Sequence, residues 1–394
     1  MSDKSPLATW KQVRYGDVVR KVSDRADPES SGLTRYVAGE HMDTDDLRVR
    51  RWGTIGEGYL GPAFNMRFKP GSVLYGSRRT YLRKVAVPDF EGICANTTFV
   101  LEPKSSDLSA EFLPLVMSTD AFHAHSIQQS KGSVNPYINF SDLTWYEFAL
   151  PPLDEQKSIV ELVAAADAVV EAWEVGLSAA TAVADAVLNE VPLSPTLTLG
   201  DVLDESPRSG LTIKPTEANT GVRALTIGSA GEFGYSPAGM KSIDNSDLRD
   251  CEVKAGDLFV TRSNTIARVG YPFRYSGGDD GVVVYSDLLF RLRLRPSTIS
   301  PAILEAYLRS PRARRFIRSI AAGTSDSMKK INAGNLKRLP LPDLGGTQQA
   351  VLEATVDAQS ALVLEARDRL RIAQKLRATL IVRLLSQGVD RVIQ

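Results

Sequence analysis

The first candidate for a chemical site is a set of three glycines, Gly56, Gly58 and Gly61. Their spacing matches the G-x-G-x-x-G pattern of a dinucleotide-binding site. Such a site needs a strand directly before the glycines and a helix directly after them, because the helix N-terminus holds the pyrophosphate. Here Arg50-Arg51-Trp52 precede the pattern, Pro62 follows it, and no helical period comes next. The glycines therefore indicate a loop rather than a cofactor site.

Other catalytic patterns are incomplete. Asn135-Pro136-Tyr137 is similar to the Asn/Asp-Pro-Pro-aromatic motif of amino-methyltransferases, but one proline is missing, and we interpret it as a turn. The chain has no G-x-x-x-x-G-K-[ST] phosphate loop. Asp43, Asp45 and Asp46 lack the spacing of a nuclease acid pair and fall in a polar loop. These observations favour a protein without catalytic residues of its own.

Composition excludes further classes of site. Two cysteines, Cys94 and Cys251, are too few for a zinc site or a disulfide framework, and we expect His41, His123 and His125 to be ordinary polar residues. The chain of 394 residues is 43% hydrophobic, enough for two or three domains. It has a polar N-terminus and no apolar run near the ~18 residues of a membrane span, which predicts a cytoplasmic protein.

What remains is a set of loops rich in cationic, aromatic and amide side chains, present once in each half of the chain. Arginine can bridge guanine O6 and N7, asparagine can pair with adenine, and lysine or serine can hold phosphates. We predict that double-stranded DNA is the partner of these loops. The candidate residues are Arg48, Arg50, Arg78, Arg79, Tyr81, Lys131, Ser133 and Asn135 in the first half, and Arg262, Asn264, Arg268, Ser325, Ser327, Lys329 and Lys330 in the second.

A further basic cluster lies between residues 309 and 318, in a segment that we expect to be one helix from Ala302 to Ile320. Two interpretations stay open, a solvated helix face and a face that follows the phosphates of a nucleic acid. The cluster consists of Arg309, Arg312, Arg314, Arg315 and Arg318.

Long helices must position these loops. A helix is predicted from Asp154 to about Glu190, after the hinge Leu150-Pro151-Pro152-Leu153. At about 1.5 Å per residue it would run roughly 55 Å and would need a partner of similar length. Small or apolar residues spaced alternately by three and four predict its seam: Ile159, Leu162, Ala166, Val169, Trp173, Gly176, Ala180, Val183 and Val187.

The chain supplies such a partner in a second helical run from Gly345 to about Ser386. Residues 154–190 hold eight acidic residues and one basic residue, whereas residues 345–394 hold five acidic and seven basic residues. Opposite net charges favour pairing of the two helices. The small residues Ala166, Gly176 and Ala180 predict a close approach between them.

The chain repeats itself at an offset that drifts from about 184 to about 193 residues. Leu199-Gly200-Asp201-Val202 repeats Tyr15-Gly16-Asp17-Val18, and a helix expected at Ala302–Ile320 repeats one expected at Phe112–Gln129. Leu339-Pro340-Leu341-Pro342 stands where Leu150-Pro151-Pro152-Leu153 stood. One α+β domain with one long helix has therefore been duplicated.

This pattern predicts an α+β fold with two similar domains, each followed by a long helix. We expect the two helices to pair along each other. The predicted boundaries are 1–153 for the first domain, 154–191 for the central helix, 192–344 for the second domain, and 345–394 for the distal helix and tail.

With both hinges and the repeat in view, the chain resembles the specificity subunit of type I restriction–modification systems over nearly its whole length. The resemblance lies in Phe68-Lys69-Pro70-Gly71 with Arg78–Val87, and in Val253–Phe259. Its most specific part is Lys131-Gly132-Ser133 to Asn139 with Leu150-Pro151-Pro152-Leu153-Asp154-Glu155-Gln156. The second hinge departs from the family pattern, because Gly345-Gly346 replaces an expected acid before Gln348-Gln349.

The resemblance implies a DNA sequence-recognition subunit without catalytic residues. Each of the two similar domains would be a target-recognition domain that reads one half of a bipartite, asymmetric site. The two helices would pair as an antiparallel coiled-coil spacer that sets the gap. Two modification subunits would dock on it and bring S-adenosylmethionine, and restriction subunits could join. The alternatives are a self-contained DNA methyltransferase or nuclease, and an interaction scaffold that does not bind DNA.

Overall fold

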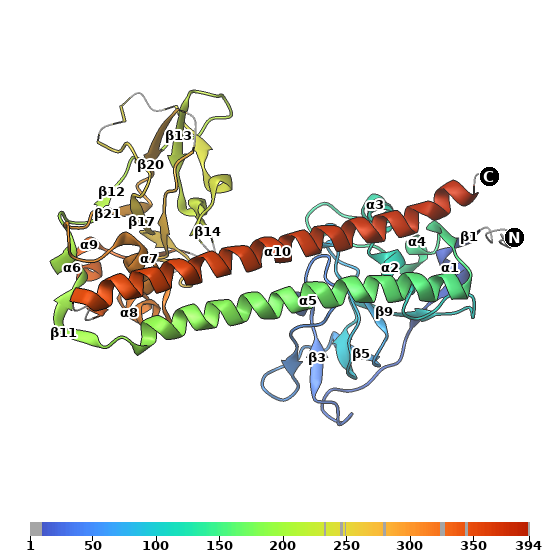
Figure 1. Ribbon diagram of the computed structural model, residues 1–394. Coiled ribbons are helices and arrows are strands. Elements are labelled where there is room, and N and C mark those ends of the chain that lie inside the picture. The colour runs from blue at the N-terminus through green and yellow to red at the C-terminus, as the bar shows by residue number, and fades with distance from the viewer. Residues whose placement is uncertain are drawn as a thin grey trace, which may run out of the picture. The chain divides into compact units, whose positions relative to one another are not determined.

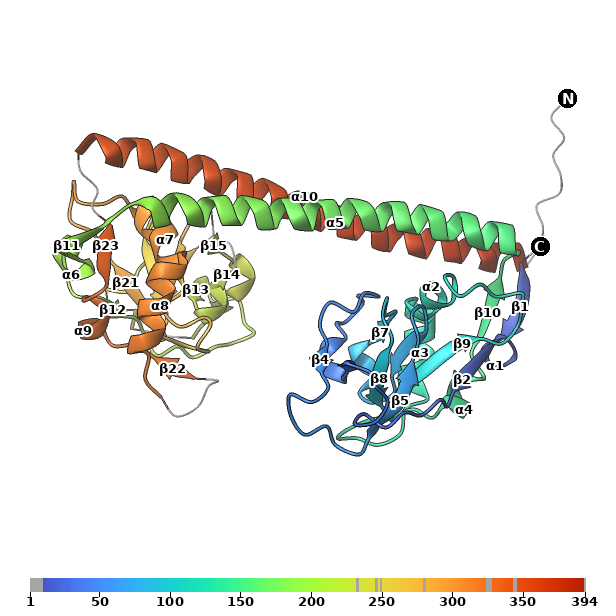
Figure 2. The ribbon, with the colours of Figure 1, turned by 90° about the horizontal axis from the view of Figure 1, so that it is seen from below.

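The computed structural model of the chain describes residues 10–231, 234–244, 247–248, 250–278, 281–323, 328–342 and 346–392, with side chains described except at 185, 346–348 and 386–392. These residues form two compact units. Unit 1 comprises the described residues up to Glu171 and those from Ile372 onward, and unit 2 comprises Ala172–Arg371. Figure 1 labels the elements of both units, and Figure 2 shows the same ribbon from below.

Unit 1 contains two four-stranded sheets and a strand pair. The first sheet is antiparallel, in the order β2 (Val19–Val22), β9 (Thr98–Pro103), β6 (Val73–Gly76), β7 (Val85–Ala86). The second has the order β4 (Gly53–Thr54), β3 (Arg35–Val37), β8 (Gly92–Ala95), β5 (Phe64–Phe68), with β3 and β8 parallel. Strand β1 (Lys11–Arg14) pairs with β10 (Glu147–Leu150) and so ties the start of the unit to the hinge.

Short helices cover the first sheet of unit 1. The predicted single helix at 112–129 is wrong, because Thr119 interrupts it and its hydroxyl accepts a hydrogen bond from the Phe122 amide at 3.2 Å, which caps a new helix. The helical elements are α1 (Tyr15–Val18), η1 (Gly39–His41), η2 (Thr80–Leu82), α2 (Leu113–Met117), α3 (Asp120–Gln128) and α4 (Phe140–Leu143).

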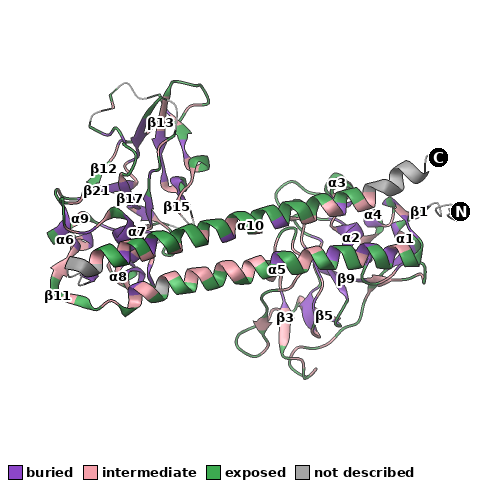
Figure 3. Ribbon diagram, in the orientation of Figure 1, coloured by how far each residue is buried: buried purple, intermediate pink, exposed green. Residues whose placement is uncertain are grey.

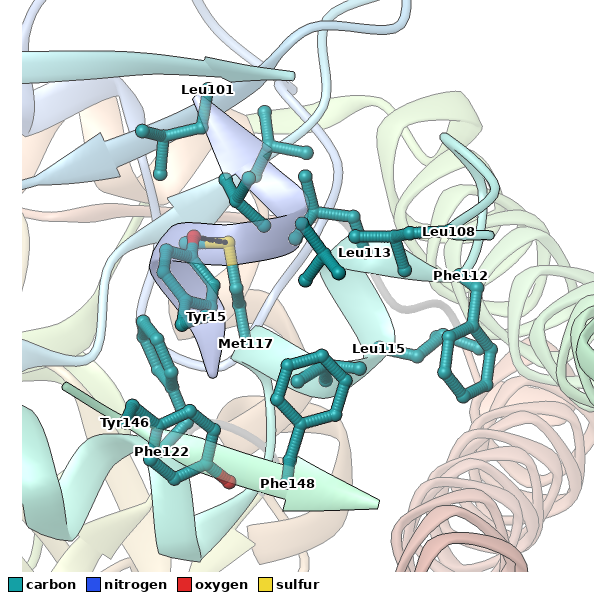
Figure 4. Packing of buried hydrophobic residues seen from close by; sticks show 14 of the residues in the cluster. Tyr15, Leu101, Leu108, Phe112, Leu113, Leu115, Met117, Phe122, Tyr146 and Phe148 are labelled. Carbon is teal, nitrogen blue, oxygen red and sulfur yellow. Dashed lines mark hydrogen bonds between the residues drawn. The ribbon is translucent and has the colours of Figure 1, made fainter. Parts of the chain in front are cut away.

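The main core of unit 1 is aromatic and aliphatic (Figure 4). Tyr15, Phe112 and Phe122 are fully buried in it. The Tyr15 hydroxyl donates to the sulfur of Met117 at 3.2 Å, which gives this buried polar group a partner. Burial raises the pKa of Tyr15, so the core contains a neutral phenol rather than a phenolate.

Unit 2 repeats the strand arrangement of unit 1. One sheet has the order β12 (Arg208–Ser209), β21 (Leu289–Leu292), β17 (Leu258–Thr261), β19 (Pro272–Arg274), and another has the order β16 (Lys241–Ser242), β13 (Val222–Leu225), β20 (Val282–Tyr285), with β13 and β20 parallel. The strand pairs are β11 (Leu193–Thr198) with β23 (Pro340–Pro342), β14 (Ala230–Gly231) with β15 (Gly234–Tyr235), and β18 (Ser263–Asn264) with β22 (Lys329–Lys330).

The predicted helix from Ala302 to Ile320 is two helices. Ser310 separates them, and its hydroxyl accepts from the Ala313 amide at 3.4 Å at the start of the second. This break places Arg309 on a different helix from the other four arginines of the basic cluster. The helical elements of unit 2 are α6 (Leu199–Val202), η3 (Ile227–Ser229), η4 (Pro237–Gly239), α7 (Pro301–Arg309), α8 (Pro311–Ile320) and α9 (Ala333–Leu336).

The duplication extends to individual backbone hydrogen bonds. In unit 1, Gly16 N donates to Thr144 O at 3.1 Å, and in unit 2, Gly200 N donates to Lys337 O at 2.9 Å. Glycine is needed at the first of these positions, because a Cβ on Gly16 would lie 2.6 Å from the Thr144 Cβ. The repeated Gly-Asp turn is thus the place where each unit closes on its own C-terminal segment.

Two long helices complete the fold, α5 (Leu153–Glu190) and α10 (Gly346–Val392). Within unit 1, Ile159 and Val163 of α5 share a buried cluster with Ile381 of α10, and Arg377 of α10 pairs with Asp167 of α5. Within unit 2, Leu188 of α5 lies in one cluster with Leu352 and Val356 of α10. Segments of the two helices therefore share cores in each unit.

The predicted seam of α5 is partly wrong. Figure 3 shows that α5 is a mixture of buried, intermediate and exposed positions. Leu162 and Val169 are 51% exposed, whereas their neighbours Val163 and Val170 are buried. Apolar residues occupy both positions of each pair, so the helical period alone left two registers open. No described atom comes within 4 Å of the position that a Cβ on Gly176 would take, so Gly176 does not mark a close approach.

The hinge before α5 is fastened by a buried amide that the sequence analysis overlooked. The Gln156 side chain donates to Asp107 O at 2.6 Å and to Pro151 O at 2.8 Å, and accepts from Ser109 N at 2.8 Å. Beside it, the Trp10 indole donates to Glu155 Oε2 at 2.9 Å. The Glu-Gln pair of the hinge therefore fixes the first turn of α5 to its domain.

Neither a membrane span nor a metal cluster is found in the described parts of the chain. No helix there is both long enough and apolar enough to cross a bilayer. Across the same ranges, no three His, Cys, Asp or Glu side chains gather closely enough to hold a metal ion.

Candidate nucleic-acid interface

In unit 1 the structure brings together two loops that are about 50 residues apart in sequence. Ile138 N donates to Ser77 O at 2.9 Å, and Lys131 and Tyr137 exchange backbone hydrogen bonds at 2.8 and 2.9 Å. Arg78 also bridges to Tyr137, so segments 77–79 and 131–138 form one small platform. Five predicted residues lie on it: Arg78, Arg79, Lys131, Ser133 and Asn135.

Arg79 holds the two loops of this platform together. Its backbone has a φ of 50°, in the left-handed region, and its amide donates to Pro136 O at 2.6 Å. Its Nε donates to Asn135 Oδ1 at 3.3 Å. The adjacent Arg78 guanidinium lies 5.6 Å from the centre of the Tyr137 ring. Ser133 and Asn135 are exposed on the same hairpin.

Lys131 is held by a carboxylate at the base of the hairpin. Its Nζ donates to Asp142 Oδ2 at 2.9 Å, and this hydrogen bond lowers the pKa of Asp142. Asp142 also accepts from the Asn139 amide at 3.3 Å. The ammonium group is half exposed, so it keeps donors available for a phosphate.

Arg48 and Arg50 converge on one carboxylate. Arg48 Nε lies 3.4 Å from Asp46 Oδ1, and Arg50 Nε donates to Asp46 Oδ2 at 2.6 Å. Burial of Asp46 opposes its ionisation, but the hydrogen bond from Arg50 and the neighbouring Arg48 outweigh it, so the pKa of Asp46 is lowered. The two guanidinium groups are therefore fixed in direction while about 40% and 38% of their side-chain surface stays exposed.

The turn at η2 joins these arginines to the platform. Tyr81 stands on this turn and is 52% exposed. Arg83 closes the turn through its amide, which donates to Thr80 O at 2.9 Å, and pairs with Asp45 at 2.6 Å and Asp120 at 2.7 Å. Thr80 is buried and its hydroxyl lies 2.7 Å from that of Ser130.

Unit 2 contains the same platform with different side chains. Ile331 N donates to Arg262 O at 3.0 Å, Ala322 and Lys330 exchange backbone hydrogen bonds, and Asn264 pairs with Lys329 across β18 and β22. These contacts bring Asn264, Lys329 and Lys330 together. Ser325 and Ser327, which were also predicted, lie outside the described residues.

Two of the predicted arginines of unit 2 are engaged by the protein. Arg262 Nη1 donates to Asp287 O at 3.1 Å, and its guanidinium lies 5.5 Å from the Phe290 ring centre. Arg268 Nη2 donates to Ala230 O, and its guanidinium lies 4.1 Å from the Tyr271 ring centre. Both side chains are partly buried, so they support the loop that carries them.

The basic cluster of 309–318 is mostly structural. Arg314 is buried and its Nη2 donates to Ala267 O at 3.1 Å and Val269 O at 2.7 Å, and burial lowers its pKa to about 10. Arg312 donates to Asn189 O and Val191 O at 2.7 and 2.8 Å, in the last turn of α5 and directly after it. Only Arg315 and Arg318 of this cluster are exposed. The break at Ser310 separates Arg309 on α7 from the other four arginines on α8, so the interpretations of a solvated face or a phosphate-following face apply to Arg315 and Arg318 alone.

The motifs weighed for catalysis do not form a cofactor site or an acid–base group. The Gly56–Gly61 segment is a turn between β4 and β5, and β4 pairs antiparallel with β3 instead of leading into a helix. Burial lowers the pKa of His123 to about 4, which leaves its imidazole neutral at pH 7. What the arrangement offers chemically is a set of positioned N–H donors and exposed aromatic or apolar tips, presented once per unit.

Comparison with known proteins finds relatives of the first part of the chain. Residues 8–174 match the type I restriction modification DNA specificity domain. The specificity subunit of the type I restriction enzyme EcoDI from Escherichia coli is 29% identical over 154 residues, which are 39% of this chain and 34% of that protein. The chain thus aligns with about a third of the length of this curated relative.

Solved structures share the fold along the whole chain. A chain of the structure described as "Structural basis underlying complex assembly and conformational transition of the type I R-M system" has a TM-score of 0.55 at 19% identity and covers 96% of this chain and 97% of its own. The type I restriction-modification S subunit from M. genitalium has a TM-score of 0.53 at 12% identity, with 98% of each chain covered. At these identities the likeness shows a mixed α/β fold with long helices. The 8–174 segment is a homologue of type I specificity domains.

Proposed function

We propose that this chain, whose residues 8–174 match a type I specificity domain, is the DNA sequence-recognition subunit of a type I restriction–modification complex. Each domain reads one half of a bipartite, asymmetric site. The observation that carries the proposal is the platform built twice: Ile138 on Ser77 in unit 1, and Ile331 on Arg262 in unit 2. The scaffold is the same and the exposed side chains differ, which suits two readers of two different half-sites.

The division of labour on each platform follows from its groups. Lys131 and Arg79 in unit 1, and Lys329 and Lys330 in unit 2, carry charge toward the phosphates, which gives affinity without sequence preference. Exposed side chains at the turn tips, such as Tyr81, are free to meet base edges. Neutral net charge of the chain is compatible with this function, because other subunits of the complex supply further phosphate contacts.

The long helices act as an antiparallel coiled-coil spacer that sets the gap between the half-sites. Three observations support this. Asp167 pairs with Arg377, Ile159 and Val163 cluster with Ile381, and the opposite parts of both helices share the other core through Leu188, Leu352 and Val356. A residue that lies later on α5 meets one that lies earlier on α10, as antiparallel pairing requires.

Two modification subunits dock on this spacer and bring S-adenosylmethionine, so this chain contributes no catalytic residue and holds no cofactor. Exposed apolar side chains on the helices support such docking. In unit 1 these are Leu162 and Val169 of α5 and Ile372, Leu376 and Val382 of α10, each about half exposed or more. The complex works in the cytoplasm and methylates adenine, and restriction subunits join it to translocate and cut DNA.

Methylome sequencing tests the proposal. A host strain with the gene should carry one interrupted methylation motif that is lost when the gene is deleted and returns on complementation. A methylome that stays the same after deletion would refute the proposed function. Calorimetry on the isolated chain separates the rival classes, since a self-contained methyltransferase would bind S-adenosylmethionine, whereas a specificity subunit should give no heat of binding.

A further inference from the structure

The turn that follows the central strand is built alike in both units and ends in an exposed apolar or aromatic tip. In unit 1 the Arg83 amide donates to Thr80 O, and in unit 2 the Arg268 amide donates to Thr265 O, both at 2.9 Å. The residue after each threonine is the tip. Tyr81 is 52% exposed, and Ile266 is 37% exposed.

Each tip is braced from the helix that packs against its turn, by opposite chemistry. In unit 1, Asp120 on α3 accepts from Arg83 at 2.7 Å. In unit 2, Arg314 on α8 donates to the carbonyls on either side of Arg268, those of Ala267 and Val269. The two turns are held by different contacts, an ion pair in unit 1 and arginine–carbonyl hydrogen bonds in unit 2. This indicates that the direction of the tip matters, because a surface turn without a function would need neither contact.

Further contacts hold the unit 2 turn at Gly270 and Tyr271. Gly270 N donates to Thr261 O at 2.7 Å, and its φ of 65° lies in the left-handed region. Guanidinium groups of Arg268, Arg309 and Arg314 lie 4.1, 5.2 and 5.5 Å from the Tyr271 ring centre. Arg314 uses Nη2 for both carbonyls, while its Nη1 is buried without a hydrogen-bond partner. Because a buried arginine is costly when its donors are unused, the two carbonyl contacts hold Arg314 to this loop.

We propose that Ile266 reads the C5 methyl group of a thymine in the half-site of unit 2, with Arg314 as the residue that positions its turn. The inference rests on the DNA-recognition function proposed above. Ile266 has no polar atom, so the base feature it can distinguish in the major groove is the thymine methyl. Asn264, Lys329 and Lys330 lie on the strand pair that flanks Ile266. Their amide and ammonium groups hold the DNA backbone near this residue. Its β-branched side chain is already restricted, so little freedom is lost on contact.

Deoxyuridine scanning tests the inference. Duplexes in which single thymines of the methylated motif are replaced by deoxyuridine are titrated with the complex of this chain and its modification subunits. One replacement, in one half-site, should weaken binding about fourfold, the size expected for one methyl removed from an apolar contact. Ile266→Ala should weaken binding to the thymine duplex by a similar factor and should no longer distinguish thymine from deoxyuridine at that position.

Val282→Ala is the matched control, because Val282 is equally exposed at 37% but lies on β20, away from the platform strands β18 and β22. It should distinguish the two bases as the wild type does. Arg314→Met should lose the discrimination at the same position, and Arg314→Lys, which retains a donor for both carbonyls, should restore part of it. Melting temperatures of all variants show whether the domain is still folded, and Ile266→Val provides a milder variant should Ile266→Ala unfold.

Two outcomes would overturn the inference. One is that Ile266→Ala responds to deoxyuridine like the wild type at every position, and the other is that no single deoxyuridine replacement weakens binding of the wild-type complex. Failure of the proposed function looks different, because the wild-type complex would then prefer no bipartite sequence at all.

Discussion

The carboxylate of Asp167 on α5 accepts a hydrogen bond from Nε of Arg377 on α10, although 210 residues separate them in sequence. Within unit 1, the ion pair joins the first part of α5 to the C-terminal part of α10. The Arg377 side chain is 18% exposed and that of Asp167 is 43% exposed, so solvent weakens the attraction.

Reversing the charge of one residue of this pair should destabilise the protein, and reversing the charge of the other residue as well should restore stability. We expect Asp167→Arg or Arg377→Asp alone to lower the free energy of unfolding by about 1 kcal/mol, because each creates a like-charge contact. The double exchange should recover most of this loss. Urea unfolding measures it, with Lys375→Asp on an exposed face of α10 as the control for net charge. Additive losses in the double variant would contradict the pairing.

Removal of the buried amide at the hinge should cost more. Gln156→Ala leaves two carbonyls and one amide without their partner, and we expect a loss of about 2–4 kcal/mol in the free energy of unfolding. Gln374→Ala, at an exposed glutamine of α10, should change stability by less than about 0.5 kcal/mol. Equal effects of the two substitutions would show that the hinge hydrogen bonds are dispensable.

The platform of unit 1 should supply salt-dependent affinity. Replacing Arg78, Arg79 and Lys131 with alanine should weaken DNA binding by the assembled complex and reduce the slope of log affinity against log salt by up to about 3. Arg20→Ala provides a control, since Arg20 is equally surface-exposed but lies on β2 and pairs with Glu102. An unchanged salt slope in the triple variant would exclude phosphate contacts at the platform.

Acid should release the arginines that Asp46 holds. The folded-state pKa of Asp46 is lowered, so its contribution to stability is present above the ordinary carboxyl pKa and is lost as pH falls through the lowered folded value. Asp46→Asn should therefore be less stable than wild type near neutral pH, and the difference should shrink as the pH falls below about 4. Unfolding measured between pH 7 and pH 3 checks the sign, and a difference that grows in acid would contradict it.

A longer α5 should alter the gap in the DNA site. Four residues inserted after Ala180, about one helical turn, should change the number of unspecified base pairs between the half-sites but leave the half-sites as they are. Methylome sequencing of the strain that carries the insertion reads both. An unchanged gap would refute the spacer function.

Sequence periodicity was sufficient for the existence of α5 and α10 and for the repeat, because long helices and duplicated turns leave strong local signals. It was not sufficient for the register of the α5 seam, since Leu162 and Val163 are both apolar and only the partner decides which is buried. The helix breaks at Thr119 and Ser310 were missed because each depends on one hydroxyl cap within an otherwise helical pattern.

The candidate site was predictable only in part. Loop composition drew attention to Arg78, Arg79 and Lys131, and the structure brings these together. Sequence composition could not distinguish an arginine that faces solvent from one that braces a loop. For this reason the buried Arg314 was grouped with the exposed Arg315. The role of Ile266 depends on its equivalence to Tyr81, which emerges only when the backbone hydrogen bonds of the two turns are compared.

Both ends of α5 are secured by side chains that would break their hydrogen bonds if the helix turned about its axis: Gln156 at its start and Arg312 at its last turn. Rotation of α5 about its own axis is therefore restricted at both ends. Each residue added to it changes the angular phase between its ends by about 100° as well as the length by about 1.5 Å. Insertions in α5 should therefore change the spacing between the DNA half-sites only when they add a nearly whole number of helical turns. Insertions of other lengths should fail to do so.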